Sequence, residues 1–165
     1  MKSKILMYVL VTAGICGWAW WSMRRDETAK AQQHAAVQLA WVWFHNLGAG
    51  DVPQAMEKCD VPFDWDGREG VHDTQRLRAL LEENFKATSS AFPAWQLPAY
   101  SMGVEFQYDE TLNPEVAKLA PSGAIAVSIE EAHPPANAAA RCCVVFVRKG
   151  DNPKVVGFRD RTVQK

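Results

Sequence analysis

An uncharged stretch from Ile5 to Met23 limits what this chain can form more than any other feature of its sequence. At about 1.5 Å of rise per residue, a helix over this stretch just crosses a hydrocarbon core of about 30 Å. Indole rings favour the membrane interface, and three tryptophans lie near the end of the stretch: Trp18, Trp20 and Trp21. The pattern predicts a membrane anchor over residues 1–25 and a globular domain over residues 26–165.

A cleaved signal peptide is the main alternative, because it also has a basic start and an apolar middle. Cleavage requires small side chains ahead of the charged residues, and bulky tryptophans occupy those positions here. A lipoprotein would use Cys16, but Ile15 stands where such a site needs a small residue. We therefore favour an uncleaved signal-anchor.

Basic residues flank the anchor almost equally: Lys2 and Lys4 before it, Arg24 and Arg25 after it. Asp26 and Glu27 follow directly. The short segment ahead of the apolar stretch leaves no room for a cytoplasmic domain. We expect a single-pass inner-membrane protein whose domain lies outside the cytoplasm, in a bacterial periplasm or its equivalent.

The composition of the remaining chain suits one packed domain. Hydrophobic residues make up 48% of the 165 residues. A domain of roughly 140 residues is close to the commonest size. The net charge is −1 and the basic residues form no block, which argues against nucleic acid as the main partner, because phosphate binding needs clustered Lys and Arg.

Three helices are predicted in this domain. Residues 27–47 contain no Gly or Pro and place apolar side chains at helical spacing, and Gly48 ends the helix. Asp51 starts a short second helix with Pro53 in its first turn. Asp73 or Thr74 caps the third helix, whose buried stripe consists of Leu77, Leu80, Leu81 and Phe85.

Strands are predicted from alternating or continuous apolar patterns. A short strand covers residues 61–67, and residues 100–108 show the clearest alternation. Residues 113–120 suggest a short helix. Residues 141–149 are apolar on both faces, which is typical of a central strand covered on both sides. The other predicted strands are residues 124–130 and 154–160, the latter after a turn at residues 150–153.

This order of elements predicts an α+β fold with a curved antiparallel sheet around three helices. The stretch Trp43 to Asp51, followed by Ala55 and then Val61 to Phe63, resembles the NTF2-like superfamily, which includes SnoaL-like and ketosteroid-isomerase-like domains. The resemblance implies a cone that opens on a pocket between sheet and helices. It also implies a homodimer through the outer face of the sheet, which the strand at residues 141–149 would suit.

Asp64, Asp66 and His72 are the candidate catalytic residues, because they lie close in sequence and an Asp in an apolar pocket can act as a general base. In ketosteroid-isomerase-like enzymes an acidic base and phenolic donors share the cavity, so the resemblance makes Tyr100 or Tyr108 candidate donors. The other interpretation places Asp64 on the solvent side of a short strand and Asp66 in a turn.

A ligand pocket in such a cone would be lined by Trp41, His45, Trp65 and Tyr100. His45 lies near a helix C-terminus, where a histidine also interacts favourably with the helix dipole. Trp95 lies in an apolar loop and is predicted either to cover the mouth of the cone or to contact a partner.

The cysteines leave two alternatives. Cys59 forms a disulfide with Cys142 or Cys143 in an oxidising compartment, or all three are reduced and buried. The four histidines have no ligand spacing and no CxxC motif exists, so we expect neither a metal site nor a cofactor.

Together these features favour a membrane-tethered, non-enzymatic module that binds a protein partner or a small apolar ligand. A homodimer scaffold is its companion. The alternative is a SnoaL-like or ketosteroid-isomerase-like enzyme that uses Asp64 or Asp66 as its base. The two classes differ in whether the cone holds a pocket with a buried carboxylate.

Overall fold

The computed structural model describes residues 2–67, 70–85, 106–109, 118–131 and 142–161. For residues 2–19, 106–109, 130–131 and 142 it describes the backbone alone. The chain divides into two compact units, Met1–Gln33 and His34–Lys165. Each unit is considered by itself below.

Helix α1 runs from Lys2 to Gly48, so the first unit is helical throughout its described residues. The helix predicted over residues 27–47 is therefore confirmed in its conformation and its end, but its start at residue 27 was the wrong prediction. No Gly or Pro interrupts the chain between Trp18 and Leu47, so the helix continues through residues 26 and 27. From Trp20 onward, where side chains are described, no helix has both the length and the apolar character needed to cross a membrane.

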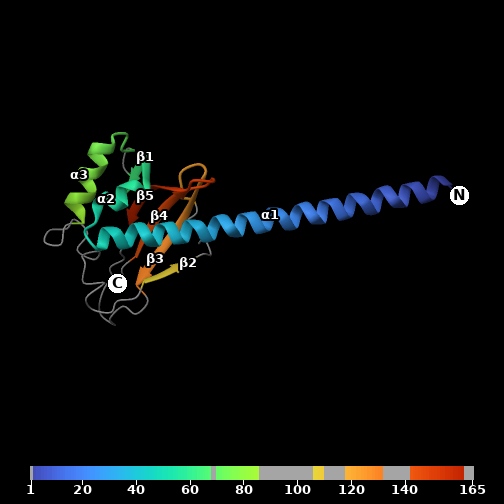
Figure 1. The fold of residues 1–165 in the computed structure, drawn as a ribbon, viewed down its shortest axis with the longest axis horizontal. Helices are drawn as coiled ribbons and strands as arrows, with labels where there is room; N and C mark the ends of the chain where they lie inside the picture. Colours follow the sequence, from blue (N-terminus) through green and yellow to red (C-terminus); the bar gives the residue numbers. More distant parts are fainter. Residues whose placement is uncertain (1, 68–69, 86–105, 110–117, 132–141, 162–165) are drawn as a thin grey trace. The chain divides into compact units, whose positions relative to one another are not determined.

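The second unit is an α+β domain, as predicted, with the end of α1 followed by two helices and five strands (Figure 1). The strands form one five-stranded sheet in the order β1-β5-β4-β3-β2. The further elements are α2 (Val52–Glu57), β1 (Cys59–Trp65), α3 (Thr74–Asn84), β2 (Phe106–Asp109), β3 (Ala124–Glu131), β4 (Cys142–Arg148) and β5 (Lys154–Asp160).

The predicted helix starts are confirmed by their hydrogen bonds. The Asp51 side chain accepts a hydrogen bond from the backbone N–H of Gln54 at 3.0 Å and caps α2. The Asp73 side chain accepts one from the backbone N–H of Gln75 at 2.9 Å and caps α3. Both carboxylates satisfy donors that a helix N-terminus leaves unpaired.

One feature of the predicted sheet was wrong: β1 and β5 are parallel, while the other pairs are antiparallel. A hairpin forces antiparallel pairing, but α3 and three strands separate β1 from β5 along the chain, so their direction is free of that constraint. The predicted strand at residues 100–108 is seen only from Phe106, because residues 100–105 lie outside the described residues, as does most of the predicted helix at 113–120.

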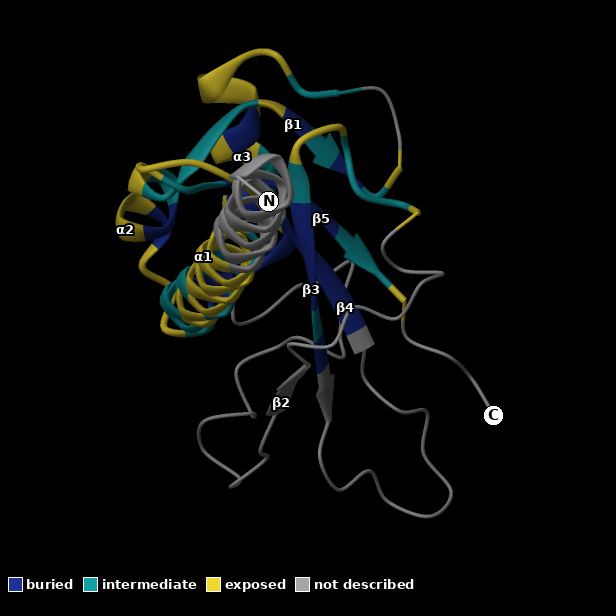
Figure 2. Cartoon of the chain, turned by 90° about the vertical axis from the view of Figure 1, so that its right-hand side faces the viewer, coloured by how far each residue is buried: buried dark blue, intermediate teal, exposed yellow. Residues whose placement is uncertain are grey.

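The sheet is buried on both faces of its central strand, as predicted for β4. Cys143, Val145 and Val147 belong to the main core between sheet and helices. Val144 and Phe146 form a second cluster with Ala126 and Val156, against which Leu119 and Ala120 of the same chain pack. Figure 2 shows the buried residues concentrated in β3, β4 and β5. The homodimer through this outer face stays a prediction. On this face, Val144 and Phe146 are already buried within the second cluster.

Candidate functional site

Asp64 lies on the sheet face opposite the helices. Its neighbours Phe63 and Trp65 are buried in the main core, so the alternation of a strand directs Asp64 to the other face. There its Oδ2 accepts a hydrogen bond from Nη2 of Arg159 on β5 at 2.6 Å, and its Oδ1 accepts one from the backbone N–H of Gly67 at 2.9 Å. Both oxygens of this candidate base are therefore engaged.

The Arg159 guanidinium is enclosed by its neighbours. Its Cζ lies 5.3 Å from the centre of the Phe146 ring, and its side chain is 23% exposed against 17% for Asp64. A Cβ added at Gly67 would lie 3.4 Å from that Cζ, so the turn after β1 passes directly over the guanidinium. This half-buried ion pair ties the edge strand β1 to β5 through side chains as well as backbone.

The other two catalytic candidates lie apart from this pair. Asp66 has a left-handed backbone, with φ of 54°, in the turn after β1, which matches the interpretation of a turn residue before Gly67. His72 is exposed. It lies between Val71, which forms an isolated antiparallel bridge with Phe63 of β1, and Asp73, which caps α3. Between described residues, no hydrogen bond or ion pair joins Asp64, Asp66 and His72 to one another.

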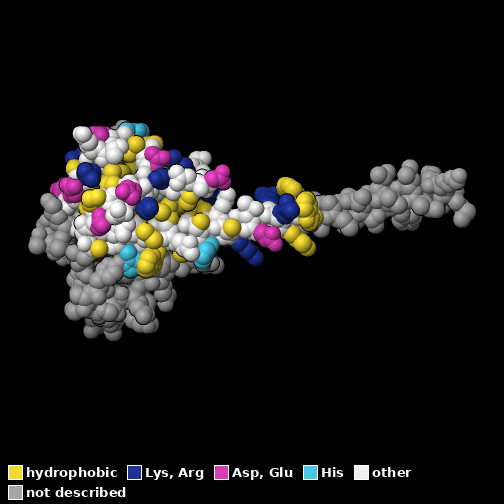
Figure 3. Space-filling view, viewed as in Figure 1, with side chains coloured by type: hydrophobic (Ala, Val, Ile, Leu, Met, Phe, Trp, Pro, Cys, Tyr) yellow, Lys and Arg dark blue, Asp and Glu magenta, His cyan; other side chains and the backbone are white. Residues whose placement is uncertain are grey.

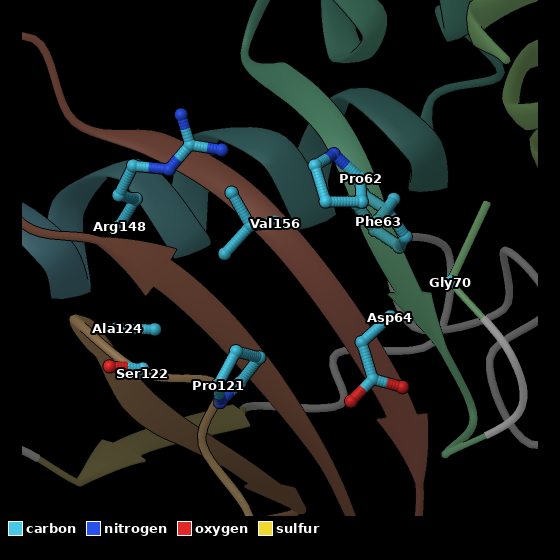
Figure 4. Close-up of a pocket in the computed structure, with 9 residues that line it drawn as sticks. All are labelled: Pro62, Phe63, Asp64, Gly70, Pro121, Ser122, Ala124, Arg148 and Val156. Carbon is cyan, nitrogen blue, oxygen red and sulfur yellow. The ribbon is translucent and has the colours of Figure 1, made fainter. Parts of the chain in front are cut away.

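A groove of about 270 Å³ lies beside Asp64 on this same face (Figure 4). That volume falls just below the range of typical ligand pockets, about 300–1,000 Å³. At its rim, Nη1 of Arg148 donates to Oδ2 of Asp60 at 2.7 Å, with side chains 44% and 41% exposed. Its lining comes from β1 and the segment after it, from β5, from the end of β4, and from the start of β3 with the turn before it: Pro62, Phe63, Asp64, Gly70, Pro121, Ser122, Ala124, Arg148 and Val156.

A second hollow, of about 450 Å³, lies between α2 and the start of α3. It is bounded by Pro53, Met56, Glu57, Thr74, Gln75 and Arg78. Neither hollow lies between the sheet and the helices, where the resemblance placed a pocket. There, aromatic rings fill the core around Phe158, with ring centroids 5.7 to 5.9 Å from those of Trp43, Trp65 and Phe85.

Of the four predicted pocket residues, Trp41 and His45 are in contact, and the pocket itself stays a prediction. Trp65 is part of that filled core, and Tyr100 lies outside the described residues, like Trp95. Trp41 is 46% exposed on α1, and its ring contacts that of His45 in a tilted arrangement, with centroids 4.1 Å apart. Partial burial lowers the pKa of His45 below its ordinary value.

Cys59 is held as a thiol. Its Sγ accepts a hydrogen bond from Trp43 Nε1 at 3.1 Å and donates one to the carbonyl oxygen of Ala55 at 3.4 Å. Burial raises its pKa to about 12, although the Trp43 hydrogen bond acts in the opposite direction. These contacts place Cys59 in the core of the second unit.

Cys59 is a free thiol, which overturns the alternative of a disulfide from Cys59. Strand β5 lies between β1 and β4, so two strand spacings of about 4.8 Å separate Cys59 from either cysteine of β4. A disulfide requires Cα atoms within roughly 7 Å. In the described part of the chain, no group of three or more His, Cys, Asp or Glu side chains is placed to hold a metal ion.

Comparison with protein-family models, curated proteins and solved structures found no match to this chain. The sequence pattern did not identify three charged residues near Asp64 and the groove: Arg159, Arg148 and Asp60. The alternation around Asp64 pointed to its outward direction, but no local signal pairs it with an arginine 95 positions away.

Proposed function

We propose that this protein is a membrane-tethered, non-enzymatic domain that binds a protein partner or a small apolar ligand. In this proposal residues 5–23 are the anchor, and residues 26–165 form an NTF2-like domain outside the cytoplasm, in a bacterial periplasm or its equivalent. The order of two helices, a strand, a third helix and four strands supports the NTF2-like assignment, since it is the order from which the cone was predicted.

One observation carries the proposal: in the part of the chain with described side chains, every exposed large hydrophobic residue lies on α1. Three of them, Trp20, Trp21 and Met23, lie at the end of the apolar stretch and are 57 to 66% exposed. The fourth, Trp41, belongs to the second unit. Exposed aromatic side chains suit a membrane interface and a partner contact respectively.

The enzyme alternative needs a carboxylate that is available to take a proton from a substrate. Asp64 instead bonds to Arg159 and to the Gly67 backbone, and Asp66 belongs to a turn. Among the described residues, the space between sheet and helices is packed with aromatic side chains, which supports binding at a surface over catalysis in an interior cavity.

The tether is tested by expressing the full chain and a chain that begins at Asp26 in a bacterial host. We expect the full chain to stay with membranes after alkaline carbonate extraction and the shortened chain to be released. An alkaline phosphatase fused after Lys165 should be active in the full chain, because that enzyme matures only outside the cytoplasm. Release of the full chain by carbonate would overturn the tether.

The contact at Trp41 is tested separately with a photo-crosslinking amino acid. We expect a discrete adduct from position 41 and none from the matched exposed position Arg78 on α3. Mass spectrometry then distinguishes a second copy of this chain from a different protein. Equal labelling from both positions would show that Trp41 is not a preferred contact.

A further inference from the structure

Two matched pairs of side chains lie at the end of the apolar stretch. The Cζ atom of Arg24 lies 4.1 Å from the centre of the Trp20 ring, and that of Arg25 lies 5.5 Å from the centre of the Trp21 ring. Each pair spans one helical turn, so each guanidinium covers the indole that precedes it on the same face of α1. Figure 3 shows hydrophobic and basic side chains gathered together on the described part of the first unit.

The arginines bind these rings although two carboxylates are close in sequence. Asp26 and Glu27 follow directly, yet among the described residues no ion pair joins either of them to Arg24 or Arg25. A guanidinium that covers a ring face keeps its N–H donors in its own plane. Those donors are therefore directed past the ring, where they can bond to the oxygens of a phosphate.

We propose that Trp20, Trp21, Arg24 and Arg25 form a collar that binds the phosphate of lipids with an anionic headgroup, of which phosphatidylglycerol is the example. The inference rests on the proposed membrane tether. Indole rings place the collar at headgroup level, and the two guanidinium groups then lie at the depth of the lipid phosphates. A zwitterionic headgroup carries its own cation, which competes with the arginines for the phosphate, whereas phosphatidylglycerol has no such competitor.

The test uses the full chain reconstituted into phosphatidylcholine vesicles that contain a small fraction of brominated lipid. Bromine quenches indole fluorescence at short range, so quenching reports which lipids lie next to the collar. We expect brominated phosphatidylglycerol to be enriched about fivefold over brominated phosphatidylcholine, the factor that corresponds to about 1 kcal/mol for a basic residue at an anionic surface. Equal quenching by the two lipids would overturn the collar and leave the tether intact.

Variants assign the preference to the arginines. Arg24→Gln with Arg25→Gln should abolish the preference for phosphatidylglycerol while quenching by brominated phosphatidylcholine persists, which shows that the anchor is still inserted. Lys30→Gln, an exposed lysine farther along α1, should keep the preference. A preference that survives in the double arginine variant contradicts the inference.

Two further outcomes are decisive. Loss of the preference on adding excess inorganic phosphate, at constant ionic strength, would show that free phosphate competes with the lipid phosphate for the two arginines, which supports the inference. An absence of quenching by either lipid would overturn the tether and the collar together.

Discussion

The guanidinium of Arg159 meets the carboxylate of Asp64 at 2.6 Å, on the face of the sheet that the helices do not cover. The two residues come from the last strand and the first strand of the domain, which are parallel neighbours. A residue that the sequence offered as a catalytic base is therefore part of the join between the two ends of the fold. Its energetic role can be measured.

Replacing Arg159 with Gln should destabilise the domain by about 1–3 kcal/mol, because the half-buried Asp64 carboxylate would lose its charged partner. Urea unfolding of the purified protein measures this change. Arg148→Gln is the matched control, since its pair with Asp60 is more exposed and should be worth less than about 1 kcal/mol. Equal losses of unfolding free energy in the two variants would show that burial of the Asp64–Arg159 pair adds nothing to the stability of the domain.

Gly157→Ala should destabilise the domain by about 1–3 kcal/mol through overpacking. The new Cβ would lie 2.7 Å from Cδ2 of Phe146 and 3.0 Å from the backbone oxygen of Asp64, and the backbone cannot easily move away. Gly70→Ala is the control, because the three heavy atoms nearest to its new Cβ would lie at ordinary contact distances of 3.7 to 3.8 Å. Thermal unfolding of both variants gives the comparison, and a stable Gly157→Ala protein would contradict the close packing.

Cys59 should resist alkylation in the folded protein. Only the thiolate reacts, and a rise in pKa from 9.0 to about 12 reduces the thiolate fraction near pH 8 about a thousandfold. Peptide mapping after iodoacetamide treatment should find Cys59 modified only after unfolding in urea, with no reductant needed. A requirement for reductant would instead reveal a disulfide.

His45 should make the domain less stable in acid. Its folded pKa lies below the ordinary value of 6.5, so the unfolded chain takes up the proton first, and stability falls as the pH drops through that value. The urea midpoint of His45→Gln should change less between neutral pH and about pH 5. His34→Gln, at an exposed position on the same helix, should retain the wild-type dependence. An unchanged slope in His45→Gln would contradict this assignment.

Features encoded within a few residues were predictable. The helix starts at Asp51 and Asp73 could be predicted because capping is a local hydrogen bond. The continuous apolar run of β4 likewise predicted burial on both faces. The parallel pairing of β1 with β5 was not predictable, since it depends on how distant strands meet. Asp64 and Arg159 are also far apart in the sequence. The alternation of buried and outward residues along β1 therefore predicted the direction of the Asp64 side chain, but not the arginine that it contacts.

The position of β5 inside the sheet has a consequence for synthesis. This strand, Lys154–Asp160, is the last along the chain but lies between β1 and β4. While the chain is being made, β1 lacks its sheet neighbour and the core lacks Val155 and Phe158 until β5 emerges. We therefore expect a nascent chain that stops before residue 154 to remain sensitive to protease, and the domain to fold only after β5 has emerged.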